Sequence, residues 1–276
     1  MKRFLTVDEI KSFENSILKF FRDYCEKNGL EYYLACGTLL GAARHQGFIP
    51  WDDDIDVFMP RKDYNFLIEN FNSSESASLK LISKETNPDF YVPFAKIYDT
   101  STVLIEKGQL VPIGVFIDII PLDFYPQNFF KSIPYRALQF IYKMQGLSHA
   151  EKTKENSKYK NFIIGAYHLL YRLLFGSEKS VQKKIFKLSD KISAAPKSDY
   201  CTFLTHKFFS TIPKMPVKWF EAPEKLIFEG EYYTVPNAYK IFLAEAYGKN
   251  YMEIPPKEKQ TGHHGFDCYF AEEKND

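Results

Sequence analysis

The chain has 276 residues, enough to bury a full hydrophobic core as one large domain or as one domain with a helical extension. Its 36 Lys and Arg nearly balance its 35 Asp and Glu, so the overall charge gives no reason to expect a nucleic-acid partner. The four cysteines are scattered and show no CxxC spacing, which indicates reduced thiols. With no signal peptide and no apolar run of the ~18 residues that a membrane span needs, we expect a cytoplasmic protein.

The first 126 residues are expected to form a mixed α/β core. Thr6 and Glu9 fit a capping box at the start of a helix that ends at Asn28 and Gly29. A short strand and a short helix are predicted next, and a second short helix is predicted to end at residue 71. The alternation of apolar residues predicts strands at 32–36, 55–59, 79–83, 94–98, 103–106 and 115–120, with a loop at 46–51 and helices at 37–44 and 62–71.

The character of the chain changes after Pro126. Residues 127–197 read as helices and hold 14 Lys and Arg against four Asp and Glu, a net charge of +10, which leaves −9 for the remainder of a chain of net charge +1. This basic region is also rich in Phe and Tyr. It is either the solvated face of a helical insertion or a surface that meets something anionic, such as a membrane leaflet or a polyanionic acceptor.

Residues 198–276 are expected to complete the core. Two short strands are predicted at 226–228 and 232–235, followed by a helix at 238–247 and an irregular tail around Pro255 and Pro256.

An Asp-x-Asp-x-Asp run, formed by Asp52, Asp54 and Asp56, opens the strand predicted after the loop. Alternate residues of a strand share one face, so the three carboxylates are expected to point the same way, while Asp53 points to the other face. Like charges placed this close repel one another unless a cation lies between them. A hard ion such as Mg²⁺, for which Mn²⁺ could substitute, suits oxygen ligands of this kind.

A second acidic position lies within an apolar strand. Asp118 interrupts the run Val115 to Ile120, where a charge without a partner would be costly to bury. A metal ion would remove that cost, and the same carboxylate could instead take a proton from an attacking hydroxyl. The alternative is a strand-end cap or the partner of a buried Arg. Asp123, beyond Pro121, is expected in a turn.

Candidate substrate-binding residues flank the acidic run. Gly37 and Thr38 are expected to form a turn whose N–H groups approach phosphate oxygens at a helix start. Arg44 could pair with a diphosphate oxygen or with one of the aspartates. Further candidates are His45, Trp51, which could stack on a base or a quaternary ammonium or simply anchor the loop, and Lys96, which is either a phosphate partner or a snorkelling edge lysine.

Two other kinds of metal site match the residue spacing in part. The acidic run begins like a calcium-binding EF-hand loop, but Val57 and Asp63 occupy the positions that require Gly and Glu, which excludes that loop. His263, His264 and Cys268 offer three zinc ligands at short spacing without an evident fourth.

The stretch CGTLLGAARHQGFIPWDDDIDVFMPRKDY, at residues 36–64, closely resembles the signature of the LicD family, a signature shared with fukutin and fukutin-related protein. The resemblance extends to FAKIYDTST at 94–102, GVFIDIIPLD at 114–123 and YGKNYMEIPP at 247–256, and covers most of the chain outside the basic region.

The resemblance implies a nucleotidyltransferase-like mixed sheet with flanking helices, into which the basic helices are inserted. It places metal ligands on Asp54 and Asp56, with Asp52 close by, and suggests a donor-pocket role for His263. The implied activity is Mg²⁺-dependent transfer of phosphocholine from CDP-choline, or of a related group from another CDP-alcohol, to a sugar hydroxyl of a cell-surface glycan precursor such as teichoic acid or lipopolysaccharide.

Several alternatives remain open from sequence. The transferred group could be glycerol phosphate, ribitol phosphate or a nucleotidyl group, because the same metal site serves each reaction. A non-catalytic nucleotide-binding or membrane-scaffolding protein is also conceivable, although the intact acidic residues argue against it. From the charge and aromatic content of the basic region, we expect peripheral contact with the inner, anionic face of the membrane that carries a lipid-linked acceptor.

Overall fold

A computed structural model describes residues 3–71, 76, 78–87, 89–90, 92–105, 111–148, 158–203, 214–260 and 267–271. The chain divides into two compact units. The first comprises residues 1–122 and 217–276, and the second comprises residues 123–216.

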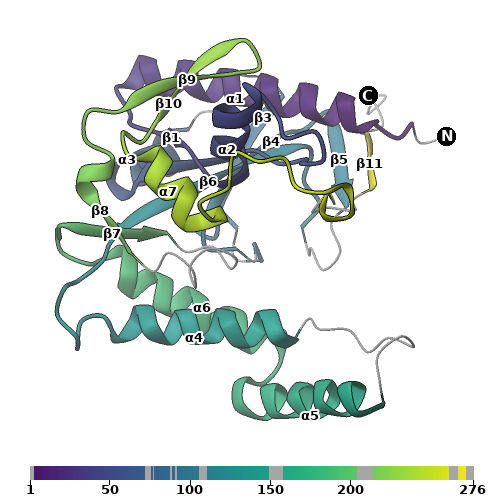
Figure 1. Cartoon of the computed structure of the whole chain (residues 1–276), viewed down its shortest axis with the longest axis vertical. Coiled ribbons are helices and arrows are strands. Elements are labelled where there is room, and N and C mark those ends of the chain that lie inside the picture. The colour runs from purple at the N-terminus through teal and green to yellow at the C-terminus, as the bar shows by residue number, and fades with distance from the viewer. Residues whose placement is uncertain are drawn as a thin grey trace. The chain divides into compact units, whose positions relative to one another are not determined.

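The first unit is built on a mixed β-sheet, which confirms the predicted fold class. Across the sheet its strands follow the order β1 (Tyr33–Leu34), β2 (Asp56–Pro60), β6 (Phe116–Phe124), β4 (Ala95–Asp99) and β3 (Leu79–Ile82) (Figure 1). Strands β2 and β6 run parallel, while the other neighbours in this order are antiparallel. The two strands predicted to carry the acidic residues are therefore direct neighbours.

Strand β6 lies inside the sheet and is apolar along nearly its whole length. Ile117, Ile119 and Ile120 are all buried, as expected for a strand that is covered on both faces. The strand continues to Phe124, four residues beyond its predicted end. The prediction that Asp123 lies in a turn is wrong, because Asp123 belongs to β6 and is 1% exposed.

Helix α1 (Val7–Asn28) has the ends that its sequence predicts. The Thr6 hydroxyl accepts a hydrogen bond from the Glu9 N–H, and the Glu9 carboxylate accepts one from the Thr6 N–H, which completes the capping box. Gly29 ends the helix in the left-handed conformation, with φ of 64°, which glycine adopts without steric strain. The helix contacts β4 with a buried face that includes Ile17, Leu18 and Phe21.

Three further α-helices and two antiparallel strand pairs complete the described part of the first unit. Helix α2 spans Cys36–His45, and α3 spans Arg61–Asn70. Strands β9 (Glu224–Phe228) and β10 (Glu231–Val235) form an antiparallel pair, and helix α7 (Tyr239–Tyr247) follows. Strand β5 (Thr102–Ile105) pairs with β11 (Asp267–Phe270), a strand that the sequence did not predict.

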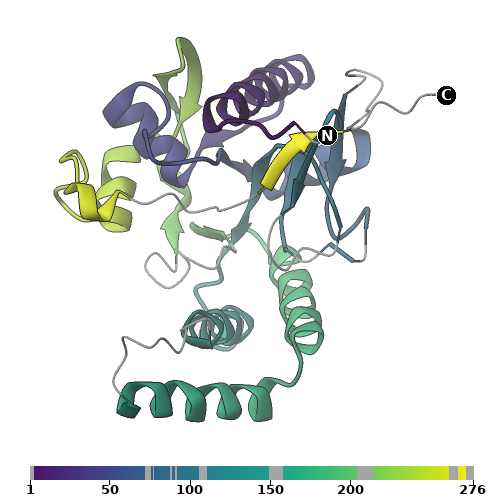
Figure 2. The same cartoon turned by 90° about the vertical axis from the view of Figure 1, so that its right-hand side faces the viewer.

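The second unit contains the basic helices. These are α4 (Ile133–Ser148), α5 (Lys158–Phe175) and α6 (Glu178–Ser193), shown from a second direction in Figure 2, with the short pair β7 (Tyr200–Phe203) and β8 (Met215–Pro216). Its core is formed mainly by α4 and α6, through the buried residues Tyr135, Leu138, Ile141, Val181, Ile185 and Ile192. This core leaves much of α5 outside.

Candidate active site

The loop before the acidic run is held from two sides. Lys11, on α1, donates hydrogen bonds from Nζ to the carbonyls of Ile49 and Pro50, at 3.3 and 3.1 Å. Glu229, at the β9–β10 turn, accepts a hydrogen bond at 3.0 Å from the N–H of Phe48. These contacts fix the path of the chain as it enters the acidic run.

The acidic run is not a strand throughout its length. Strand β2 begins only at Asp56, and the Asp52 N–H bonds to the Ile49 carbonyl at 2.9 Å, which places Asp52 in a turn. The prediction that Asp52, Asp54 and Asp56 alternate along one strand face is therefore wrong. Because of the turn at Pro50, the strand begins only at Asp56. The positions of Asp52 and Asp54 are therefore set by the loop that Lys11 and Glu229 hold, and not by strand alternation.

Asp56 and Asp118 lie opposite each other on neighbouring strands. Their Cα atoms are partners in the parallel pairing of β2 with β6. Paired positions of adjacent strands, which lie about 4.8 Å apart, present their side chains on the same face of the sheet. Two residues separated by some 60 positions in the sequence thus meet at one place.

Lys96 extends this row to a third strand. Its Cα pairs with that of Asp118, and its Nζ lies 2.7 Å from Oδ1 of Asp118, with side-chain exposures of only 5% and 15%. The same ammonium lies 3.3 Å from the centre of the Phe116 ring, where it makes a cation–π contact. Strand β4 is flanked by β6 and β3, so Lys96 is a buried ion-pair partner and not an edge lysine.

Negative charge accumulates around Asp56. Burial raises the pKa of the Asp56 carboxyl well above its usual range, and the charges of Asp54, Asp118 and Asp52 raise it further. The positive charge of Lys96 lowers the pKa of Asp56. These four carboxylates therefore share one electrostatic environment in which a cation would be stabilising.

The donor chemistry of this cluster suits Mg²⁺, which prefers carboxylate oxygens. Among the described residues, however, no three His, Cys, Asp or Glu side chains already stand in the arrangement of a formed metal site. One oxygen of Asp118 is engaged by Lys96. The described carboxylates thus have the chemistry of a divalent-cation site but not its geometry, and Mg²⁺ binding stays a prediction.

Gly37 and Thr38 lie in the first turn of α2 and support the acidic residues. A Cβ atom on Gly37 would approach Oδ2 of Asp52 to 2.5 Å, so glycine is needed for Asp52 to come this close to the helix. The Thr38 hydroxyl is buried and accepts a hydrogen bond from the Asp56 N–H at 2.9 Å. Their binding of phosphate stays a prediction.

Replacing Thr38 with Val is expected to remove this hydrogen bond while keeping the side-chain shape. A buried N–H that loses its partner costs about 1–3 kcal/mol, so chemical denaturation should show a loss of this size, and enzymatic turnover should fall as Asp56 shifts. Thr38→Ser retains the hydroxyl and is the matched control. Equal stability and turnover of the Val and Ser variants would contradict this supporting role.

Arg44, His45 and Trp51 form a group beside the acidic loop. Arg44 donates from Nη1 to the carbonyls of Tyr251 and Glu253, at 2.9 and 3.1 Å, and thereby ties α2 to the segment after α7. Its guanidinium lies 5.8 Å from the Trp51 ring centre, and Trp51 in turn meets His45 edge-to-face. Burial and the charge of Arg44 lower the pKa of His45, so its imidazole is neutral at pH 7.

Two residues near the acidic cluster were not predicted. Glu14, on α1, is 3% exposed, and Tyr247, at the end of α7, is 37% exposed. Although the residue is partly exposed, desolvation of its hydroxyl raises the pKa of Tyr247 well above its usual range, and the charges of Asp56, Asp52 and Asp54 raise it further. No spacing rule could have identified Glu14, because it reads as one polar position of an amphipathic helix, whereas Tyr247 opens the YGKNYMEIPP stretch.

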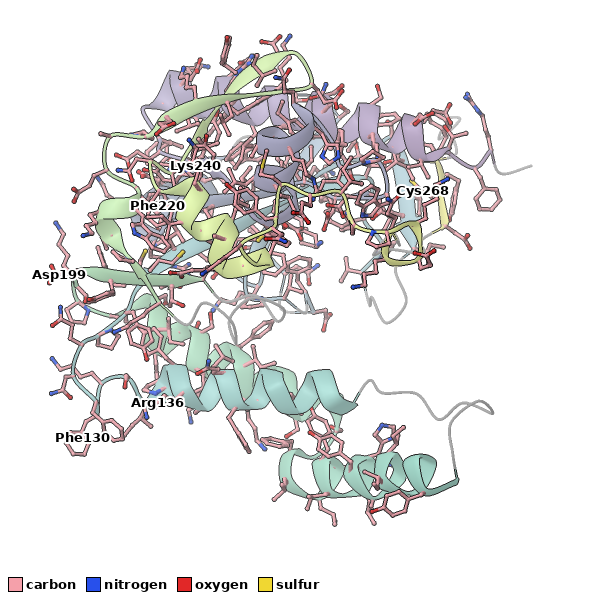
Figure 3. The ribbon with its side chains drawn as sticks, viewed as in Figure 1. Phe130, Arg136, Asp199, Phe220, Lys240 and Cys268 are labelled. Carbon is pink, nitrogen blue, oxygen red and sulfur yellow. The ribbon has the colours of Figure 1, made fainter. Side chains whose placement is uncertain are left out.

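His263 and His264 lie outside the described residues, so the donor-pocket role predicted for His263 stays a prediction, and Cys268 is the one candidate zinc ligand of this group that the structure describes. Cys268 is a buried residue of β11 (Figure 3), and burial raises its pKa to about 11. At neutral pH its thiol is therefore protonated, a poor state for binding a metal ion.

Comparison with known proteins identifies the class to which this sheet and its acidic row belong. A family model described as the LicD/FKTN/FKRP nucleotidyltransferase domain matches residues 29–140, which contain Asp52, Asp54, Asp56, Lys96 and Asp118. The matched stretch, of nucleotidyltransferase type, begins in the first unit and extends into the second as far as residue 140.

Individual relatives extend the match to nearly the whole chain. The chain is 30% identical over 263 residues to lipopolysaccharide cholinephosphotransferase LicD of Haemophilus influenzae, covering 92% of this chain and 94% of that protein. An uncharacterized protein of Rickettsia typhi is 45% identical over 112 residues (41% of this chain, 35% of that protein), and mannosyltransferase regulator 4 of Saccharomyces cerevisiae is 31% identical over 137 residues (44% and 11%). The chain belongs to the LicD family, and it is an enzyme of the transferase class.

Proposed function

We propose that this enzyme transfers phosphocholine from CDP-choline to a sugar hydroxyl of a cell-surface glycan precursor, in a Mg²⁺-dependent reaction. The observation that carries the proposal is the row of Asp56, Asp118 and Lys96 across three neighbouring strands, next to Asp54. The similarity to the Haemophilus protein over nearly the full length of both chains supports choline as the transferred alcohol and lipopolysaccharide as the acceptor. Teichoic acid is the alternative acceptor implied by the sequence resemblance.

In the proposed reaction an acceptor hydroxyl attacks the phosphorus atom that bears choline. A new phosphate ester bond forms, the phosphoanhydride bond breaks, and cytidine monophosphate leaves. Asp54 and Asp56, with Asp52 nearby and Asp118, would hold the Mg²⁺ or Mn²⁺, which when bound neutralises charge on the diphosphate.

The chain's own residues account for the remaining requirements. Lys96 supplies a fixed positive charge beside the transferring phosphoryl group, where charge rearranges during the reaction. As an alternative to holding the metal, Asp118 could accept the proton of the attacking hydroxyl through the oxygen that does not meet Lys96. In this proposal the first turn of α2, with Gly37 and Thr38, would face the phosphates, and Arg44, His45 and Trp51 would line the donor side. The family resemblance adds His263, which lies outside the described residues.

The proposed function is tested by mixing the protein with CDP-choline, Mg²⁺ and a sugar acceptor and measuring the products. Phosphocholine transfer releases cytidine monophosphate, whereas nucleotidyl transfer would release phosphocholine. A parallel screen of CDP-glycerol, CDP-ribitol and CDP-choline by metal-dependent thermal shift separates the possible transferred alcohols. Binding of a donor without any product would instead support a non-catalytic nucleotide-binding protein.

We further propose that the second unit contacts the anionic inner face of the cell membrane, where a lipid-linked acceptor would lie. Helix α5 contains Lys158, Lys160 and Arg172 and no Asp or Glu, so its charge complements anionic lipid. One helical face is formed by exposed apolar residues, namely Tyr159, Ile163, Leu169, Leu170, Leu173 and Leu174. Phe130, 76% exposed, projects from the same unit (Figure 3).

In the part of the chain that the structure covers, no helix combines the length and the apolar character needed to cross a membrane. The apolar face of α5 is thus suited to lie in the interface, because such a helix buries one face at the level of the headgroups while its polar face stays in water.

Replacing Leu169 and Leu173 with Gln should weaken binding to vesicles that contain anionic lipid. The two side chains are 62% and 75% exposed and four residues apart on α5, so the change removes apolar contact without disturbing the core. Co-sedimentation at low salt measures the effect. Val7→Gln with Ile241→Gln removes two exposed apolar residues of the first unit and is the control. Wild-type protein that fails to sediment would rule out membrane contact.

A further inference from the structure

The second unit contains a pocket that the mechanism above does not use. Its volume is about 580 Å³, and it lies beside the beginning of α4. Pockets of roughly 300–1,000 Å³ are typical of sites for small organic molecules, so this pocket has room for more than a bare inorganic anion. The lining residues that matter here are Tyr125, Gln127, Phe129, Arg136, Gln139 and Lys214.

The charged residues of the lining are both cations. Arg136, at the start of α4 (Figure 3), and Lys214 line the pocket, and no Asp or Glu is among its described lining residues. Asp199 accepts a hydrogen bond at 2.9 Å from Nε2 of Gln127 but does not itself line the pocket. The lining therefore carries a net positive charge that attracts an anion.

Each of the two cations is positioned by an aromatic ring. The Arg136 guanidinium lies 4.6 Å from the centre of the Phe129 ring, and Nζ of Lys214 lies 4.3 Å from the centre of the Tyr200 ring. A cation–π contact orients a cation without supplying the counter-charge that a carboxylate would supply. Neither cation forms an ion pair with another described residue, so both charges are available to a ligand.

The uncharged part of the lining suits a saccharide. The side-chain amides of Gln127 and Gln139 are groups that can donate hydrogen bonds to sugar hydroxyls and accept hydrogen bonds from them. The rings of Tyr125 and Phe129 add apolar surface of the kind that packs against the C–H face of a sugar ring. The pocket thus combines a place for an anionic group with a place for a polyhydroxylated one.

We propose that this pocket binds a phosphorylated saccharide, that Arg136 and Lys214 hold its phosphate group, and that the second unit thereby recognises the acceptor glycan. Arginine and lysine are suited to this role because their charge-assisted hydrogen bonds to phosphate oxygens are strong. The inference rests on the proposed function, which makes the acceptor a glycan precursor. It does not depend on contact of α5 with a membrane.

Titration of the metal-free protein with glucose 1-phosphate and glucose 6-phosphate, followed by calorimetry, tests the proposal without donor. In the absence of metal the acidic row repels phosphate and does not compete for these probes. Arg136→Gln combined with Lys214→Gln should weaken binding about 10-fold or more, because the charged partners of the phosphate are lost. Arg172→Gln combined with Lys183→Gln removes two exposed cations of α5 and α6 outside the pocket and should leave the affinity unchanged.

Three simpler ligands show which part of the probe is recognised. The proposal predicts that a hexose phosphate binds more tightly than inorganic phosphate, glucose or sn-glycerol 3-phosphate. Equal or tighter binding of inorganic phosphate would overturn it in favour of a simple anion site. Equal or tighter binding of sn-glycerol 3-phosphate would overturn it in favour of a site for a phospholipid headgroup.

A second variant is available if the double variant fails to fold, which its melting temperature shows. Gln139→Glu nearly preserves the shape of the side chain and adds a negative charge to the lining, so it should weaken hexose phosphate binding through repulsion. Wild-type affinity in Gln139→Glu, or in the folded double variant, would overturn the proposal. Wild-type protein that binds neither hexose phosphate would overturn it as well.

The failure of this inference is distinguishable from that of the proposed function. Protein that releases cytidine monophosphate from CDP-choline in the presence of a sugar acceptor, but binds no hexose phosphate in this pocket, removes the pocket alone. Hexose phosphate binding that the double variant loses, in a protein without phosphocholine transfer, supports the pocket and overturns the proposed reaction.

Discussion

Replacement of both Asp54 and Asp56 with Ala is expected to lower the release of cytidine monophosphate from CDP-choline by about 10³-fold or more. The two carboxylates stand next to Asp118 and are the residues on which the proposed metal site depends. Removing a preorganised charge-stabilising group commonly lowers turnover by about 10²–10³-fold, and here two are removed together. Turnover is measured at saturating CDP-choline and Mg²⁺.

The same double variant should remain folded. Its melting temperature in the absence of metal is compared directly with that of the wild type. Burial and the neighbouring carboxylates raise the pKa of Asp56, which means that its ionised form is disfavoured in the folded protein. For an acid with a raised folded-state pKa, stability is lost as pH rises above the unfolded-state pKa. At pH 7 the variant lacks this penalty, so we expect an equal or higher melting temperature than that of the metal-free wild type.

Asp89→Ala combined with Glu258→Ala provides the control for the double variant. Both positions are exposed, so the control removes the same number of carboxylates away from the site. It should retain wild-type turnover. Normal release of cytidine monophosphate by the Asp54 and Asp56 variant would overturn the site assignment.

Lys96→Met is expected to produce the largest loss of stability among single changes at the site. Met preserves much of the apolar stem but removes the ammonium that lies 2.7 Å from Asp118, where both side chains are largely buried. Removing one partner of a buried ion pair typically costs about 3–5 kcal/mol, because the remaining charge stays in a poorly solvated place. Turnover should fall as well, since Lys96 would no longer offset charge near the phosphoryl group.

Two comparisons identify the origin of this loss in chemical denaturation experiments. Lys80→Met makes the same change at an exposed position of β3 and should alter stability little. Adding Asp118→Asn to Lys96→Met removes the remaining charge and should restore much of the lost stability. A Lys96→Met variant as stable as Lys80→Met would show that the ion pair contributes little.

Local features of the first unit could be predicted from sequence because interactions between residues close in the chain determine them. The capping box of Thr6 and Glu9 and the left-handed Gly29 depend only on residues within one turn, and both occur as predicted. The strand interiors also agree, since their apolar residues must be covered. Strand ends agree less well: β6 runs on through Asp123, because packing, and not the preceding proline, decides where pairing ends.

Sequence patterns could not predict which segments far apart in the chain lie close together in the fold. Strand alternation suggested a common face for Asp52, Asp54 and Asp56, but only Asp56 lies in β2, and the loop tethered by Lys11 directs the other two. The pairing of β5 with β11 was likewise missed, because a four-residue strand near the end of a chain carries too weak a signal to be distinguished from a loop.

The family resemblance, the mixed α/β class and the identity of the acidic residues followed from the chain's residues alone, since they depend on residue identity and on local spacing. That Asp56, Asp118 and Lys96 form one row became visible only in the folded chain. The physical reason is that strand register and helix packing are set by burial of the whole core, so no short stretch of the chain contains the information that brings these charges together.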